Sequence, residues 1–162
     1  MNKKNILILT IPFLLISFLS CTNEEEKNQQ LESTAVVELP ADGLEVENAW
    51  ARPGSENGVS AIYMTLLNGS TEADSLLTIS SPVAGSVEVH ESYEREEGMM
   101  GMRPVKNVVV PARDVLRLEP RGLHVMLMRL NQELVEGNEV ELTLEFAKAG
   151  EIKVSAPVQS MQ

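Results

Sequence analysis

The chain has 162 residues, a formal net charge of −11 and a single cysteine, Cys21. This length suits one domain of ordinary size. The acidic balance argues against nucleic acid as a partner, because phosphate binding depends on lysine and arginine. A lone cysteine cannot form a disulfide within the chain.

Residues 1–20 are predicted to be a signal peptide. Lys3 and Lys4 precede an almost uninterrupted apolar run from Ile6 to Ser20, and Cys21 follows directly. The run is shorter than the roughly 20 residues that span a bilayer. A small residue before the cysteine resembles the lipobox of bacterial lipoproteins, so Cys21 is the predicted lipidation site and membrane anchor in the cell envelope or periplasm. The alternative is a plain secretory signal followed by an unmodified thiol.

The rest of the chain divides by composition. Residues 21–43 are rich in Glu, Gln and Asn, with few side chains to bury, and are expected to form a disordered acidic tether behind the lipidated cysteine. Residues 44–158 are expected to form one β-domain, and residues 159–162 a short C-terminal tail.

Short alternating runs between turn residues predict an all-β domain, because no long stretch has the spacing of an amphipathic helix. Many short strands with one buried face each suggest a two-sheet sandwich or a Greek-key barrel. The expected strands are 44–50, 60–67, 75–79, 87–91, 105–110, 115–118, 123–130, 140–146 and 152–158.

Histidines and methionines are concentrated in one part of the domain. The chain has two histidines, His90 and His124, and five of its eight methionines lie between or just after them: Met99, Met100, Met102, Met126 and Met128. Alternation from Leu123 onward places His124, Met126 and Met128 on the face opposite the apolar residues. Alternation likewise turns His90 toward the outer face or the strand end.

Residues two apart on one strand face lie about 6.5–7 Å apart, so His124 and Met126 can reach one small ion. Met102 ends the segment 98–102, which contains two glycines and is expected to be a loop that folds over the site. Neutral imidazole and soft thioether ligands match Cu(I), whereas zinc more often takes thiolate or carboxylate. A thioether cannot form a disulfide in an oxidising compartment.

Each of these residues also has a plainer interpretation. Methionine often fills gaps in a core, and two histidines by themselves indicate little. Met99 and Met100 are either alternative ligands or parts of a flexible loop, and Met128 is either a spare sulfur or a packing residue. Trp50, the single tryptophan, either shields a metal site from water or packs in the core.

At these residues the sequence resembles the PCu(A)C family of periplasmic copper chaperones. The family motif is a His, a Met twelve positions on, then His-x-Met after twenty-one more residues, and His90, Met102, His124 and Met126 match it. The resemblance runs from about residue 44 to 158 and includes 48–52, 61–63, 87–91, 102–103 and 122–126. It implies a cupredoxin-like fold and one Cu(I) ion bound by these four residues.

The resemblance further implies delivery of Cu(I) to copper centres such as those of terminal cytochrome oxidases, with an oxidase subunit or a Sco-type chaperone as transient partner. The tail lacks the His- and Met-rich pattern by which some members bind Cu(II), so no second site is expected. No set of catalytic residues stands out, so the chain is predicted not to be an enzyme. An electron-transfer cupredoxin is disfavoured, because its copper site needs a cysteine ligand and the single cysteine, Cys21, lies at the predicted lipidation site. The alternative is a lipid-anchored β-sandwich for protein interaction, without a metal.

Overall fold

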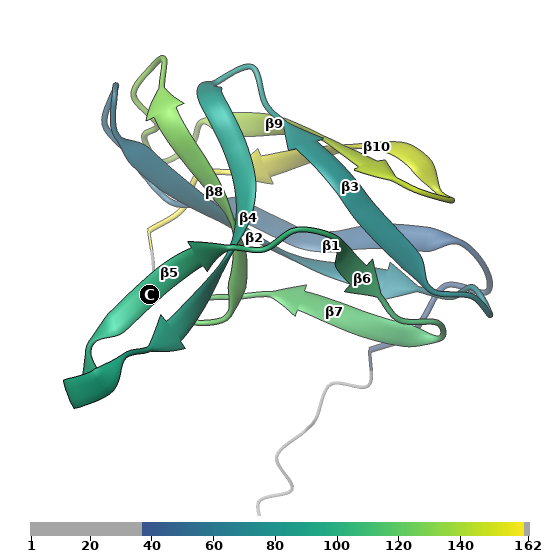
Figure 1. Ribbon diagram of the computed structural model, residues 1–162. Helices are drawn as coiled ribbons and strands as arrows, with labels where there is room; N and C mark the ends of the chain where they lie inside the picture. The colour runs from purple at the N-terminus through teal and green to yellow at the C-terminus, as the bar shows by residue number, and fades with distance from the viewer. Residues whose placement is uncertain (1–36, 161–162) are drawn as a thin grey trace, which may run out of the picture. The chain divides into compact units, whose positions relative to one another are not determined.

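The computed structural model describes residues 37–160, and the part from Leu44 onward is a β-domain of two antiparallel sheets (Figure 1). The predicted signal peptide, Cys21, most of the predicted tether and the last two residues lie outside the described residues. Within residues 37–160, no helix has the length and apolar character needed to cross a membrane.

The larger sheet carries the residues singled out above. Its strands lie in the order β1 (Leu44–Ala51), β2 (Val59–Asn68), β8 (Leu123–Leu130), β4 (Ala84–Glu94) and β5 (Met100–Pro104), and β7 (Asp114–Leu118) pairs with β2 alongside β8. A single 3-10 turn, η1 (Glu96–Gly98), joins β4 to β5. The second sheet has the order β10 (Gly150–Pro157), β9 (Glu139–Phe146), β3 (Asp74–Ser80) and β6 (Val108–Val110).

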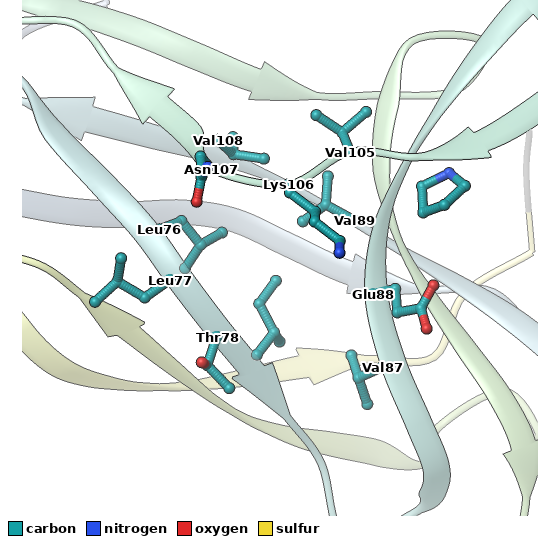
Figure 2. A pocket seen from close by; sticks show the side chains of 12 residues that line it. Leu76, Leu77, Thr78, Val87, Glu88, Val89, Val105, Lys106, Asn107 and Val108 are labelled. Atoms are coloured by element: carbon teal, nitrogen blue, oxygen red, sulfur yellow. The ribbon is translucent and has the colours of Figure 1, made fainter.

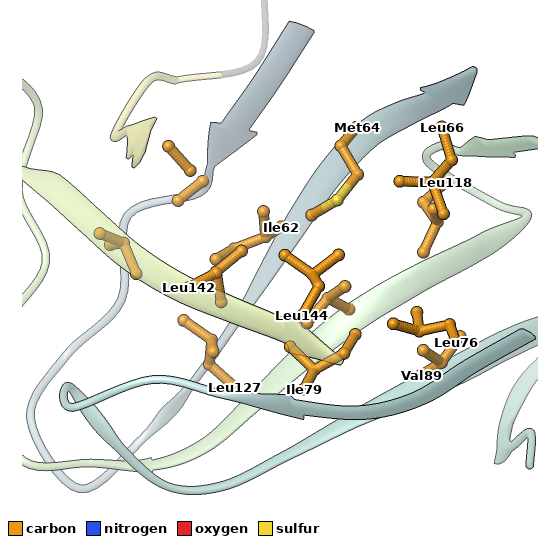
Figure 3. Close-up of a cluster of buried hydrophobic side chains, with 14 of the residues drawn as sticks. Ile62, Met64, Leu66, Leu76, Ile79, Val89, Leu118, Leu127, Leu142 and Leu144 are labelled. Atoms are coloured by element: carbon orange, nitrogen blue, oxygen red, sulfur yellow. The ribbon is translucent and has the colours of Figure 1, made fainter. Parts of the chain in front are cut away.

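The core lies between the two sheets. Alternation along β9 buries Leu142 and Leu144. Ile62 of β2 and Leu127 of β8 face them from the larger sheet, as Figure 3 shows. Each of these side chains is almost fully buried, which is worth about 2 kcal/mol per side chain of this size. The all-β, two-sheet prediction is confirmed.

The strand prediction was wrong between residues 98 and 110. One strand over 105–110 was expected, but β6 begins only at Val108, because Asn107 adopts a left-handed backbone conformation with φ of 57°. The segment expected to be a glycine-rich loop forms β5 from Met100 onward, paired in register with β4.

Gly101 explains why this segment is a strand. It stands opposite Tyr93 in the β4–β5 pair, and a Cβ at this position would lie 2.8 Å from Tyr93 Cζ and 2.5 Å from Arg95 Nε. The tyrosine ring therefore lies over the glycine, and the guanidinium carbons of Arg95 and Arg103 lie 5.6 and 5.1 Å from the ring centre. Here glycine provides room for a cross-strand aromatic ring instead of a flexible loop.

Asp74 ties the start of β3 to the turn between β9 and β10. It is 6% exposed, and its carboxylate accepts hydrogen bonds from the backbone amides of Ser75, Lys148 and Ala149 at 2.7–2.9 Å. Burial of the carboxyl raises its pKa, but these three hydrogen bonds and the nearby Lys148 charge lower it more, so the pKa of Asp74 lies below its usual value. One buried side chain thus holds the start of β3 to the β9–β10 turn.

Candidate metal centre

Both histidines lie on the outer face of the larger sheet, away from the core. His124 on β8 stands directly opposite His90 on β4, and Met126 stands opposite Glu88 in the same ladder. The centres of the two imidazole rings are 6.2 Å apart. Because a bond between a metal and an imidazole nitrogen is about 2 Å long, both rings can place one nitrogen on the same ion.

The ring of His124 is fixed by a backbone carbonyl. Its Nδ1 lies 3.1 Å from the carbonyl oxygen of Gly122, which can only accept a hydrogen bond, so Nδ1 carries the proton. Nε2 therefore has the free lone pair. His124 is only 5% exposed although it lies on the outer face, because the side chains around it form a hollow.

The ring of His90 is fixed by a carboxylate. Its Nε2 lies 3.1 Å from Glu88 Oε2, so Nε2 donates the hydrogen bond and the lone pair is on Nδ1. Nδ1 is buried and, among residues 37–160, has no hydrogen-bond partner. An unpaired buried polar atom costs free energy. Coordination of a metal ion by Nδ1 would remove this cost.

Met102 reaches the same face because it is on a regular strand. In the β4–β5 register, Met102 stands directly opposite Ser92, so the two side chains lie on the same face of the sheet. Ser92 is two residues from His90 on β4, so His90 lies on that face as well. The expectation that a loop carries Met102 over the site was therefore wrong, because β5 carries it. Sequence alternation did not reveal the pairing, which depends on where the β4–β5 hairpin turns.

A hollow of about 430 Å³ contains His124, Met102 and Met126. The hollow brings together three of the four predicted ligands, and Met100 also lines it. His90 is not among its lining residues but is the direct cross-strand neighbour of His124. Met102 is 57% exposed, whereas the side chain of His90 is 12% exposed. The imidazoles are thus the buried part of the site and Met102 its exposed part.

A row of rings extends from the histidines across the sheet. Trp50 of β1 packs against Tyr63 of β2 with ring centres 4.6 Å apart, and Tyr63 lies 6.4 Å from His124. Trp50 is half-buried on this face and is not part of the core cluster. Its ring supports Tyr63, which in turn adjoins the ring of His124.

The predicted donor set consists of two imidazole nitrogens and two thioether sulfurs. Within residues 37–160, no group of three or more His, Cys, Asp or Glu side chains is arranged to hold a metal ion. Hard cations and zinc favour such oxygen- and thiolate-rich groups. Thioether and imidazole donors instead favour a soft monovalent ion.

Glu88 and Gly122 are functional candidates that the sequence analysis missed. Ligating histidines generally donate their second ring N–H to a carboxylate or a backbone carbonyl, and these two residues supply one acceptor of each kind. A signal for Glu88 was available, because residues two apart on a strand share a face. Gly122 acts through its backbone, so its residue type carried no such signal.

A second cleft, of about 480 Å³, lies between the two sheets where β3 and β4 diverge. Figure 2 shows Leu76, Leu77 and Thr78 on one side and Val87 and Val89 on the other. Its lining contains no histidine, cysteine or methionine. This cleft therefore lacks the donors of the candidate metal centre.

Comparison with known proteins gives a consistent result. The LpqE-like family model matches residues 44–158. Lxx21020 of Leifsonia xyli subsp. xyli, which bears a lipoprotein name, is 28% identical over 119 residues, covering 74% of this chain and 71% of that protein.

Two solved structures share the fold. The copper-bound PCuAC domain from PmoF2 is 25% identical with a TM-score of 0.62, covering 77% of this chain and 100% of that domain. CuI-DR1885 from Deinococcus radiodurans is 32% identical with a TM-score of 0.56, covering 79% of this chain and 84% of that protein. The cupredoxin-like fold and the family resemblance are thus confirmed. From Leu44 to Val158, this chain is a member of the LpqE-like family, which is the family of PCuAC domains.

Proposed function

We propose that this protein is a copper chaperone of the bacterial cell envelope that carries one Cu(I) ion on His90, Met102, His124 and Met126. Two solved relatives are named for bound copper, and one of them for Cu(I). One observation carries the proposal: Nδ1 of His90 is buried, has no hydrogen-bond partner within residues 37–160, and belongs to a ring whose centre is 6.2 Å from that of His124. Each ring has its other nitrogen fixed, so one lone pair per ring is available to an ion.

Copper is the cargo of this protein, and the proposal assigns it no reaction of its own. The four proposed ligands are neutral, so they do not cancel the positive charge of Cu(I). Unlike a thiol, none of them must lose a proton before it binds the ion. Such a site binds Cu(I) less tightly than a thiolate site, which favours release to an acceptor. We propose copper centres of terminal oxidases as acceptors, with an oxidase subunit or a Sco-type chaperone as the transient partner. Lipidation of Cys21 would hold the carrier at the membrane.

The first test is a Cu(I) titration of the full-length chain in detergent under anaerobic, reducing conditions, with a chromophoric chelator as competitor. One tightly bound equivalent is expected. Binding of no copper would contradict the proposal and leave a β-domain that serves protein interaction without a metal.

Glu88→Ala is expected to weaken Cu(I) binding by about 10- to 100-fold, the usual effect of removing a partner that orients a ligating histidine. Without the carboxylate, the ring of His90 is free to carry its proton on Nδ1. Glu88→Gln keeps an oxygen acceptor and should retain most of the affinity. The same competition titration measures both variants.

Glu91→Ala is the matched control for Glu88. Glu91 is also on β4, but on the opposite face, where its carboxylate pairs with Arg103 at 2.7 Å. Its replacement removes the same charge without touching His90. Equal losses for Glu88→Ala and Glu91→Ala would mean that charge near the strand, and not ring orientation, accounts for the effect.

A further inference from the structure

Met100 shares the hollow of the candidate metal centre although it is not among the four proposed ligands. It lines the hollow together with Met102, Met126 and His124. Met100 and Met102 are two apart on β5, so both side chains lie on the same face of the strand. Their Cα atoms are therefore about 6.5–7 Å apart. Three thioethers thus surround one opening.

The donors in this site are arranged from exposed to buried. Met100 and Met102 are 56% and 57% exposed, on a strand that ends the order of the larger sheet. His124 is 5% exposed, and Nδ1 of His90 is fully buried. The thioethers of β5 are thus the donors nearest to solvent, and the imidazole nitrogens are the most buried.

We propose that Met100 is a further Cu(I) contact that, with Met102 and Met126, forms an outer all-thioether station between a copper donor or acceptor and the two imidazoles. The inference rests on the proposed function and deepens it. Each step is a ligand exchange in which one Cu–S bond forms as another bond to copper breaks. The ion stays Cu(I), and no proton moves, because thioether and neutral imidazole donors carry no acidic proton to release.

Met99 shows that exposure alone does not define this station. Met99 is 58% exposed, almost the same as Met100, and adjacent to it in the chain. It lies at the end of the 3-10 turn, before β5 begins, and does not line the hollow. The register of β5, in which Gly101 stands opposite Tyr93, turns Met100 and not Met99 toward the site face.

The experiment compares Met100→Leu with Met99→Leu in the full-length chain in detergent. Leucine keeps the apolar bulk and removes the sulfur. Stopped-flow mixing of the Cu(I)-loaded protein with a chromophoric chelator measures the rate of copper release. Met100→Leu is expected to slow release several-fold, because one thioether of the exchange path is missing, and Met99→Leu is expected to match the wild type.

A second readout uses methionine labelled with 13C at the methyl group. Addition of Ag(I), a soft ion that does not change oxidation state here, should shift the methyl signals of Met100, Met102 and Met126 and leave that of Met99 in place. If the wild type binds one Cu(I) but Met100→Leu releases it as fast as Met99→Leu, and the Met100 signal does not move, the station is disproved. Absence of any copper binding would instead contradict the proposed function itself.

Discussion

Met126→Leu is expected to weaken Cu(I) binding by more than about 100-fold, because loss of a ligand should exceed the 10- to 100-fold cost of losing an orienting partner. Leucine preserves the size of the side chain, so the fold should be little changed. Met126 lines the hollow beside His124, whereas Met128, the other methionine of β8, does not line it. Competition with a Cu(I) chelator measures the loss.

The matched control is Met128→Leu. Met128 is on the same strand and the same face, also half-buried, but it pairs with Val59 and Ser86 and does not line the hollow. Its replacement should leave Cu(I) affinity at the wild-type value. His124→Ala should weaken binding as strongly as Met126→Leu, with circular dichroism confirming that the buried position tolerates the change. Equal affinities for Met126→Leu and Met128→Leu would remove Met126 from the ligand set.

Asp74→Ala is expected to lower the free energy of unfolding by roughly 3 kcal/mol, because it leaves three backbone amides without their charged acceptor. Urea denaturation followed by circular dichroism measures the change. Glu72→Ala is a suitable control: it also removes a carboxylate, but one that is exposed and bonded only to the Lys148 ammonium at 2.8 Å. An exposed ion pair of this kind contributes little, so the control should be close to wild type.

The Asp74 effect should depend on pH. Because the pKa of Asp74 is lower in the folded than in the unfolded chain, its ionised carboxylate stabilises the fold above the unfolded value of about 3.9. This contribution is lost as pH falls through the lower pKa of the folded state. The difference in stability between wild type and Asp74→Asn should therefore shrink from about pH 5 to about pH 3. A constant difference over this range would mean that packing, and not charge, makes Asp74 important.

Much of the fold followed from alternation alone. β9 alternates strictly and β8 alternates from Leu123 to Leu127, so the limits and buried faces of both strands were predicted almost to the residue. The outer-face position of His124 and Met126 followed from the same period. β5 was missed because glycine and methionine give no strand signal, and because the ring that covers Gly101 comes from another strand.

The candidate ligands were proposed from the sequence pattern and the family resemblance, but the arrangement of their atoms could not be predicted. The sequence analysis proposed four ligands, and the structure shows which nitrogen of each histidine has its lone pair available. That choice depends on Glu88 and on the Gly122 carbonyl, which only the folded chain brings to the rings. The difference between Met99 and Met100 likewise depends on the β5 register, which no local pattern determined.

The candidate metal centre and the hydrophobic core occupy opposite faces of the same sheet. Val125 and Leu127 point inward between His124, Met126 and Met128, which point outward, so the same strand supports both. An empty carrier therefore keeps its packing, and loading adds only the mass-action stabilisation that any ligand confers on the state it binds. A domain organised in this way can fill and empty without repacking its core, so copper binding should change its stability without changing its fold.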